Sequence, residues 1–453
     1  MQKQQDSYFS TTRIIMLGFL LVILIGTFLL MLPVSRSGQH SPSFVDTLFT
    51  STSAVCVTGL MTFNTAETWS FFGQAVILVL IQIGGLGFIT VTSGFYIALH
   101  KRMNMKNRML IQDNFNLIGL SGGVKFIRNV IKGTLIAEGA GALLYMTVFV
   151  PEYGAEGIWI SVFTSVSAFC NAGIDIIGTD SLCSYAANPV INLVTCVLVI
   201  SGGIGFIVWW DILNTVKQYR HQGMRALRYL SLHTKIALSA TAVLIIGGWL
   251  MFFIFEYNNP LTIGNMPLGD KLMVAFFQSV TARAAGFVTI PQEKLTNASI
   301  IISLPLMFIG GSPSGTAGGI KTVTAAVVIA SVLSTIRNRK VVVLFGRTVT
   351  KHAVRRAISV MFVSFATLIV SMLMLAAVSD ADFLAVLYEA AGAATTVGFS
   401  RGLTSQLDFW GKLIIIITMY FGRIGPISLA VAFRMKKEKQ NIITYPLEDV
   451  SVG

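Results

Sequence analysis

The chain has 453 residues, of which 54% are hydrophobic and only 12% are charged, and its formal net charge is +13. Soluble domains carry about 25% charged residues, so this composition excludes a soluble globular protein. The long apolar stretches predict an all-α polytopic membrane protein rather than a barrel of short alternating strands.

The first apolar stretch runs from Ile14 to Leu32. It is long for the core of a signal peptide, and no small-residue cleavage site follows it. We therefore interpret it as a retained membrane span.

From this span onward, one four-part pattern occurs four times. Each unit has a span, an apolar segment too short to cross a core of about 30 Å, a glycine-containing loop and a second span. In chain order these parts are 14–32, 44–55, 56–59 and 69–99; 127–150, 158–169, 170–173 and 189–216; 236–255, 271–282, 283–286 and 299–336; and 353–378, 383–394, 395–398 and 409–433. We predict repeats over residues 1–100, 101–220, 221–340 and 341–434, with a tail over 435–453. Eight spans and four re-entrant helices would then surround a pseudo-fourfold axis.

The four loops each end in a glycine, and these glycines recur at roughly 113-residue intervals, as expected for internal repeats. The candidate filter residues are Cys56, Val57, Thr58 and Gly59; Cys170, Asn171, Ala172 and Gly173; Ala284, Ala285 and Gly286; and Thr396, Val397 and Gly398. A non-helical loop at membrane depth must be buried in protein or line a water-filled cavity. Four such loops around one axis can turn backbone carbonyls toward a monovalent cation, and glycine tolerates the dihedral angles this needs. We predict an ion-selectivity filter; four merely duplicated helical hairpins are the alternative.

Arg283 is the exception among these nearly uncharged loops. We expect it to tie the third loop to its surroundings, with Glu389 as its candidate partner, rather than to face the ion.

The charged residues divide between the two sides of the predicted bundle. Most of the Lys and Arg residues lie in the connections between units and in the C-terminal tail, which predicts a cytoplasmic location for that side and for both termini. This placement argues against nucleic acid as the partner of the positive charge. Many acids fall on the opposite side, namely Glu67, Glu152, Glu156, Asp175, Asp180, Asp380, Asp382 and Asp408. They predict a vestibule that concentrates cations, unless they are ordinary exposed loop acids.

Glycine clusters occur in every second span. Those at 84–87 and 202–205 are interpreted as close helix packing through small residues. In the third unit, five glycines and a proline interrupt the span, and such a segment cannot remain a regular helix at low cost. The interrupting residues are Gly310, Gly311, Ser312, Pro313, Ser314, Gly315, Thr316, Ala317, Gly318 and Gly319. We expect this segment to line the cavity below the filter, with a simple kink as the alternative.

Other motifs do not support enzymatic chemistry. Residues 315–322 are reminiscent of a phosphate-binding loop, but Ile320 separates glycine from lysine and no strand precedes them, so we predict no bound nucleotide. Cysteines and histidines form no metal-ligand spacing, and we predict no enzyme activity.

The fourfold span–pore loop–span plan, with one filter glycine per unit, resembles the Trk/Ktr/HKT superfamily of potassium transporters from about Ile14 to Arg434. The eight spans and short N-terminus are most similar to the Ktr membrane subunit (KtrB). The resemblance implies a K⁺-uptake subunit of the plasma membrane, surrounded by lipid, that forms a homodimer and is regulated by a cytosolic nucleotide-binding ring. Gly59 favours K⁺, because sodium-preferring plant members have serine there.

The same resemblance implies roles for two further sites. The interrupted segment, residues 310–319, would be an intramembrane gate, and Arg423 would face the pore near it as a barrier to leakage. Pairing of Arg423 with a carbonyl or carboxylate is the alternative. Dependence on Na⁺, or its symport, is left open, and a secondary transporter coupling a cation to another solute is the alternative function.

Overall fold

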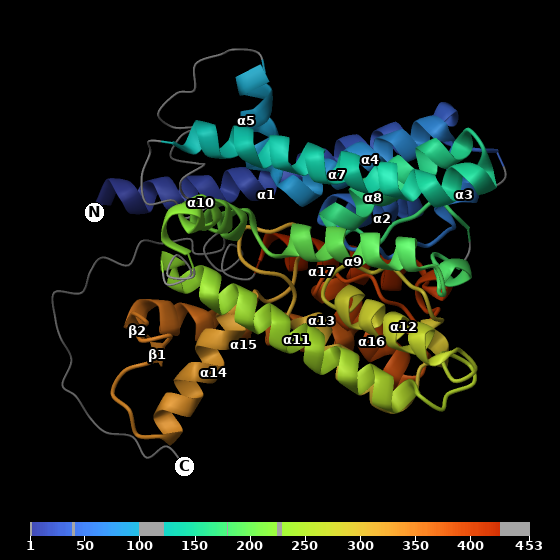
Figure 1. The fold of residues 1–453 in the computed structure, drawn as a ribbon. Coiled ribbons are helices and arrows are strands. Elements are labelled where there is room, and N and C mark those ends of the chain that lie inside the picture. Colours follow the sequence, from blue (N-terminus) through green and yellow to red (C-terminus); the bar gives the residue numbers. More distant parts are fainter. Residues whose placement is uncertain (1, 39–40, 99–121, 179, 224–228, 426–453) are drawn as a thin grey trace.

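The structure is a computed structural model that describes residues 2–38, 41–98, 122–178, 180–223 and 229–425 (Figure 1). Long helices form the outside of a bundle, and some of the shorter helices lie within it. Four helices are long and apolar enough to cross a membrane, and each coincides with the predicted first span of one unit. They are α1 (Gln2–Met31), α7 (Gly123–Tyr153), α11 (Leu232–Glu256) and α15 (Lys351–Val378).

The predicted short segments form helices of 12–15 residues. They are α2 (Phe44–Cys56), α8 (Glu156–Cys170), α12 (Leu268–Thr281) and α16 (Phe383–Ala394). At 1.5 Å per residue their lengths are about 18–23 Å, less than a bilayer core. Local sequence sets their starts: Ser43 and Asp46 form a capping box on α2, and Asp382 caps α16.

The second spans of the first two units are bent, a feature that the sequence analysis did not predict. The helices α4 (Phe71–Leu86) and α5 (Phe88–Ala98) meet at 100°, and α9 (Pro189–Gly203) and α10 (Phe206–Gln222) meet at 98°. The residue at each break is a glycine with positive φ, Gly87 at +83° and Gly205 at +94°. This backbone conformation ends a helix, and glycine adopts it without steric cost.

The second span of the third unit is also discontinuous, and that of the fourth unit is described only as far as Gly425. In the third unit, α13 (Asn297–Phe308) and α14 (Thr322–Ile336) are separated by residues 309–321, as predicted. In the fourth unit, α17 (Phe409–Ile424) ends at Gly425, where φ is +86°. The predicted continuation of this span to 433, and the tail over 435–453, lie outside the described residues.

These breaks affect the number of spans. Within the described ranges, four helices qualify by length and apolarity, or up to six when each bent pair counts as one. The predicted number of eight spans is reached only if α13 and α14 together count as one broken span and the 16-residue helix α17 counts as a further span. The repeat boundaries stay a prediction.

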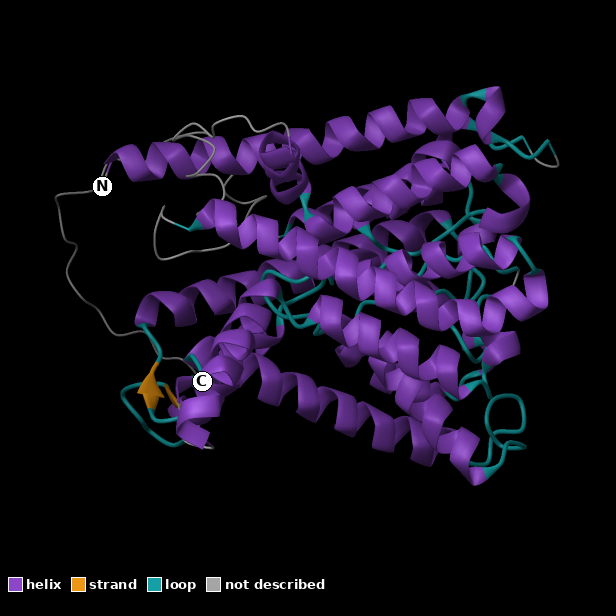
Figure 2. Cartoon of the chain, turned by 45° about the horizontal axis from the view of Figure 1, so that its top comes forward, coloured by secondary structure: helices purple, strands orange, loops and turns teal. Residues whose placement is uncertain are grey.

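The remaining described elements are short. They are η1 (Pro33–Ser35), α3 (Thr65–Thr68), η2 (Cys183–Tyr185), η4 (Gln292–Lys294), η5 (Thr404–Gln406) and the strands β1 (Val343–Leu344) and β2 (Arg347–Thr348). The two strands form an antiparallel hairpin between α14 and α15, shown in orange in Figure 2. Phe345 and Gly346 both have positive φ, as a tight two-residue turn requires. The sequence analysis did not predict this hairpin.

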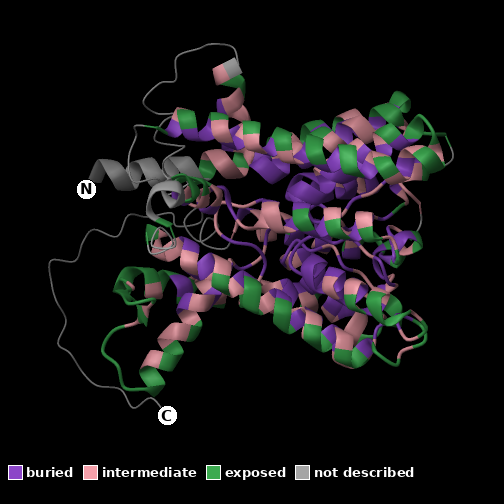
Figure 3. Ribbon diagram, viewed as in Figure 1, coloured by how far each residue is buried: buried purple, intermediate pink, exposed green. Residues whose placement is uncertain are grey.

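Burial follows the same architecture (Figure 3). The interior of the bundle is buried, whereas large apolar side chains on the long helices face outward, for example Ile136 at 72% and Phe362 at 73% exposed. Extended apolar surfaces of this kind are unfavourable in water. A lipid environment covers them at no such cost.

Candidate functional site

The four predicted filter loops share one backbone conformation. Two residues before each glycine the chain enters the left-handed region, and at the glycine φ is positive again. The left-handed residues are Val57, Asn171, Ala284 and Thr396, with φ of 56°, 61°, 66° and 53°, followed by Gly59, Gly173, Gly286 and Gly398 at 95°, 64°, 80° and 84°. Each loop therefore reverses direction in the same way after its short helix.

Hydrogen bonds attach each loop to the end of its own helix. The residue before the glycine donates its N–H to a helix carbonyl at 2.8–3.1 Å in every unit. Side chains add further bonds: Gly59 N–H donates to Ser53 Oγ at 3.1 Å, and Ile174 N–H donates to Ser167 Oγ at 3.1 Å. In the third unit Thr281 Oγ1 donates to the Phe287 carbonyl at 2.7 Å. The sequence analysis missed these residues, although a Ser or Thr five or six residues before three of the four glycines was a visible signal.

The four glycines close a ring. A Cβ added to any one of them would lie within 3.0 Å of a backbone carbonyl oxygen in another loop. The glycine–carbonyl pairs are Gly59 with Ala172, Gly173 with Ala285, Gly286 with Val397 and Gly398 with Thr58. Each loop therefore meets the next in chain order, and the fourth meets the first. Glycine is required here for close approach as well as for its positive φ.

A cavity of about 500 Å³ lies on one side of this ring and is lined by all four glycines. Of the acids predicted to form a vestibule, Asp175 lines it, whereas Glu67, Glu152 and Asp180 do not and are exposed. Burial raises the pKa of Asp175 from 3.8 to about 6. Asp175 Oδ1 accepts a hydrogen bond from Ile177 N–H at 3.4 Å. Among the described residues that line the cavity, Asp175 is therefore the one acid, and its charge depends on pH.

The predicted gate segment, residues 310–319, lies on the other side of two filter loops. Thr316 Oγ1 donates to the Phe169 carbonyl and lies the same 3.0 Å from Asn171 Oδ1. At its other end, a Cβ on Gly318 would collide with Thr396 Oγ1. The segment belongs to the third unit, so it connects the filter loops of the second and fourth units.

The base of this segment is closed by its own hydrogen bonds. Ile320 N–H donates to the Phe308 carbonyl at 3.1 Å, and Thr322 N–H donates to the Gly311 carbonyl at 3.0 Å. The hydroxyls of Ser312 and Thr322 are 2.8 Å apart. The segment is a tied loop rather than a kinked helix, because its two ends pair with each other.

Arg423 contacts this loop. Its Nη1 donates to the Thr316 carbonyl at 2.5 Å, and its Nη2 donates to the Gly84 carbonyl and lies 3.4 Å from the Gly85 carbonyl. Of the two predicted roles, pairing with carbonyls is observed, and the role as a barrier stays a prediction. The guanidinium joins the fourth unit to the gate segment and to the first unit.

The glycine clusters of the second spans pack as predicted, against the ends of the short helices. Added Cβ atoms at Gly84, Gly202 and Gly422 would collide with the carbonyl oxygens of Val55, Phe169 and Ala394. The first glycines of these clusters therefore serve close packing, whereas Gly87 and Gly205 break the helices.

The predicted pairing of Arg283 with Glu389 is wrong. Glu389 accepts hydrogen bonds from Ser400 Oγ at 2.6 Å and Thr404 Oγ1 at 2.5 Å, in the loop that follows the fourth filter glycine. Arg283 instead donates through Nη2 to the Gly310 carbonyl at 3.2 Å. The partners of Glu389 lie in the loop after Gly398, whereas Arg283 bonds to the start of the gate segment, so the two side chains do not pair.

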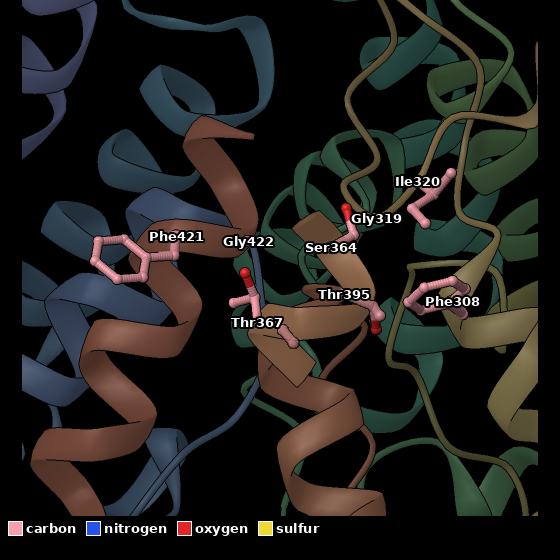
Figure 4. Close-up of a pocket in the computed structure, with 9 residues that line it drawn as sticks. Phe308, Gly319, Ile320, Ser364, Thr367, Thr395, Phe421 and Gly422 are labelled. Carbon is pink, nitrogen blue, oxygen red and sulfur yellow. The ribbon is translucent and has the colours of Figure 1, made fainter. Parts of the chain in front are cut away.

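A small cavity lies beside the gate segment (Figure 4). It has a volume of about 20 Å³, enough for about one water, and is lined by Gly319, Ile320 and Thr395. Ser364 and Thr367 of α15 and Phe421 of α17 form its other side. Packing around the gate segment is therefore incomplete between the third and fourth units.

Comparisons with known proteins cover the whole chain. A family model described as TrkH, cation transport protein, matches residues 2–445. The potassium/sodium uptake protein NtpJ of Enterococcus hirae is 38% identical over 100% of this chain and 99% of its own. The Ktr system potassium uptake protein B of Bacillus subtilis is 37% identical over 98% of this chain and 97% of its own. The crystal structure of the potassium transporter TrkH from Vibrio parahaemolyticus has the same fold, with a TM-score of 0.71 over 92% of this chain and 85% of that one, at 18% identity.

Proposed function

The chain belongs to the TrkH family of cation transport proteins, and on this premise we propose that it is a K⁺-uptake subunit with a channel-like pore. The family transports ions and is not an enzyme family, and its members lie in membranes. The ring of four glycines, each against the carbonyl of the next loop, is the observation that carries this proposal.

In the proposed pathway, K⁺ reaches the ring from the 500 Å³ cavity, where the Asp175 carboxylate attracts it. At the ring, backbone carbonyls of the filter residues replace water around the ion. The membrane potential supplies about 2.3 kcal/mol per charge for each 100 mV. The closed approach of the four loops supports this role, because it concentrates carbonyl oxygens in one place.

The gate segment would obstruct the pathway below the ring. Its contacts with Phe169, Asn171 and Thr396, in two different units, support a location across the pore. Arg423 would stabilise the closed state through its bond to the Thr316 carbonyl, and its positive charge would repel cations. Conduction then requires the segment to move and these bonds to break.

The proposal extends to the assembly. We propose a homodimer in which each chain has its own pore, both termini on the cytoplasmic side and regulation by a separate nucleotide-binding ring. The names of the Ktr-type relatives support a multi-component system. Basic residues 101–108, predicted to face the cytoplasm, lie outside the described residues. Na⁺ dependence is included because the Enterococcus hirae relative is named a potassium/sodium uptake protein.

Uptake of K⁺ and Na⁺ in cells lacking their own K⁺-uptake systems tests the proposal. The wild-type chain should restore K⁺ uptake, and Gly59→Ser should lower its preference for K⁺ over Na⁺, since a Cβ at Gly59 would lie 2.6 Å from the Ala172 carbonyl oxygen. Gly139→Ser is the matched control, because Gly139 is exposed on α7 and a Cβ there meets no atom within 4 Å. An unchanged preference in well-expressed Gly59→Ser would refute the filter assignment.

A further inference from the structure

The ring of four glycines has one boundary that the chain does not bridge. Consecutive units are joined by the chain, because each second span leads into the first span of the next unit. The contact of Gly398 with the Thr58 carbonyl lies between the fourth unit and the first, where no such connection exists. We call this contact, together with the packing of α17 against α2, the seam. Only non-covalent contacts hold the seam, so the ring can open there most easily.

A largely buried ion pair lies across the seam. Lys412 Nζ, on α17, donates to Asp46 Oδ1, on α2, at 2.8 Å, and the two side chains are 18% and 8% exposed. Asp46 Oδ2 accepts from Ser43 Oγ at 2.7 Å and from Ser43 N–H at 3.2 Å, so the same carboxylate also fixes the start of α2. A hydrogen bond between two charged groups is about twice as strong as a neutral one. Removal of either partner would leave the other charge buried and unpaired, which is strongly unfavourable.

The other three units have no charge at the corresponding position. Lys412 is the fourth residue of α17, and the fourth residues of α4, α9 and α13 are Gln74, Asn192 and Ile300. Gln74 Oε1 accepts from Trp159 Nε1 at 2.9 Å, so a neutral hydrogen bond joins the first unit to the second. Of the two salt bridges in the described ranges, the one at Lys412 joins two units, and the other lies within the fourth unit. The ion pair therefore coincides with the boundary that the chain does not bridge.

We propose that Lys412 and Asp46 are positioning residues that close the filter ring and thereby set its preference for K⁺ over Na⁺. The helix that carries Asp46 leads directly into the first filter loop, and the helix that carries Lys412 follows the fourth. Holding these helices together keeps the Thr58 carbonyl against Gly398. A ring of carbonyls discriminates between ions through the number and placement of its oxygens, so a displaced carbonyl weakens the discrimination. This inference rests on the proposed function.

A double-mutant cycle on the full-length protein tests the pair. The measurements are the Tm of the purified protein and the ratio of K⁺ to Na⁺ flux in proteoliposomes. Lys412→Gln and Asp46→Asn each leave one charge unpaired, so each should lower the Tm and reduce the preference for K⁺ several-fold. The double variant has no unpaired charge and should recover most of both losses. Lys412→Arg keeps the charge and should retain most of the preference. Losses that simply add in the double variant would overturn the proposal.

Two control variants remove comparable contacts away from the seam. Arg401→Gln breaks the other salt bridge, in which Arg401 Nη1 lies 3.8 Å from Asp382 Oδ2 within the fourth unit, and it should leave the ion preference unchanged. Trp159→Phe removes the neutral bond to Gln74, at a boundary that the chain bridges. It should lower the Tm without changing the preference. If Trp159→Phe reduced the preference as much as Lys412→Gln does, the seam would have no special role and the proposal would fail.

A milder variant decides the test if the single charge variants do not fold. Tyr420 OH donates to the Met16 carbonyl at 2.9 Å across the same boundary, so Tyr420→Phe should also reduce the preference for K⁺. Its matched control is Tyr145→Phe, which removes a hydroxyl contact within the second unit and should keep the preference.

The outcomes separate this proposal from the proposed function. A wild-type flux ratio without preference for K⁺ would refute the proposed function, whereas the Tm cycle involves no transport and would still measure the ion pair. If the wild type prefers K⁺ and the seam variants lose Tm but keep that preference, the ion pair only stabilises the fold. That result would overturn the further inference and leave the proposed function intact.

Discussion

Four carbonyl oxygens limit which residues the filter loops can contain. The side chains of these loops differ between units, but Gly59, Gly173, Gly286 and Gly398 share a positive φ and a close approach to another loop. Selectivity that relies on backbone oxygens does not need equal side chains. Side chains matter at the rim instead, where Asp175 is the charged residue that lines the cavity within the described ranges.

Uptake should depend on external pH through Asp175. Because burial raises its pKa to about 6, the carboxylate is charged at pH 7.5 and neutral at pH 5. At subsaturating K⁺ the initial uptake rate should fall roughly twofold between these pH values, with a midpoint near 6, as one nearby charge is lost. Asp175→Asn should have the low rate at both.

The control for this measurement is Asp180→Asn. Asp180 is exposed and does not line the cavity, so this variant should keep the wild-type pH profile. If the uptake rate of Asp175→Asn still depended on pH as in the wild type, the titrating group would be a residue other than Asp175.

The elements that bend or break are those that reach the ring. The bends at Gly87 and Gly205 lie a few residues after Gly84 and Gly202, which pack on the ends of the short helices. In the third unit the corresponding break is expanded into the gate segment. Three second spans therefore approach the ring closely and then change direction.

Two glycines of one cluster should differ in the cost of substitution. At Gly87 a Cβ meets no atom within 4 Å, so Gly87→Ala should cost only the backbone strain of φ +83° and ψ +143°, a conformation almost restricted to glycine, about 1–3 kcal/mol. At Gly84 a Cβ would collide with the Val55 carbonyl, so Gly84→Ala should lower the Tm and the folded yield much further. Equal losses of Tm and folded yield in Gly87→Ala and Gly84→Ala would contradict the separate roles of the two glycines, bending for Gly87 and close packing for Gly84. Gly139→Ala, on open helix surface, should be neutral or slightly stabilising.

The gate segment should be released when Arg423 is replaced. Loss of a charged hydrogen bond costs about 1.5–3 kcal/mol, so Arg423→Gln should raise basal K⁺ flux about tenfold or more. Arg423→Lys separates the two roles of this residue. It keeps the charge, but one ammonium nitrogen cannot reach both the Thr316 and Gly84 carbonyls as the guanidinium does.

We therefore expect Arg423→Lys to raise flux in proteoliposomes nearly as much as Arg423→Gln. Wild-type flux in Arg423→Lys would instead assign the effect to charge repulsion alone.

At the scale of the molecule, the chain closes on itself. Gly398 meets the Thr58 carbonyl, Lys412 Nζ lies 2.8 Å from Asp46 Oδ1, and Tyr420 OH donates to the Met16 carbonyl at 2.9 Å. The fourth unit is thereby joined to the first.

The distribution of charge predicts how this closed bundle lies in the membrane. Lys and Arg concentrate in the connections between units, so both termini should be cytoplasmic. A green fluorescent protein fused after Gly453 should fluoresce, and an alkaline phosphatase inserted after Gly38 should be active. Gly38 lies in an exposed loop with open space around it, so the insertion should leave the bundle intact. If an alkaline phosphatase fused after Gly453 were active, the C-terminus would lie outside the cytoplasm and the predicted orientation would be wrong.

The sequence by itself determined where the short helices lie and where the four glycine turns follow them. These features are local: a capped apolar segment, a glycine turn and a period are written in consecutive residues, as with α16, whose predicted bounds match the structure. The break in the third unit was equally local, because glycine and proline oppose a helix regardless of context.

Only the tertiary structure decided what these parts touch. Arg423 bonds to Gly84 across 339 residues, and Arg283 turned away from the predicted Glu389 toward Gly310. The bends at Gly87 and Gly205 were not distinguishable from packing, because glycine serves both purposes and only its neighbours select one. Contacts between distant backbone segments leave no pattern in any one stretch of chain, and the ring of carbonyls is made of such contacts.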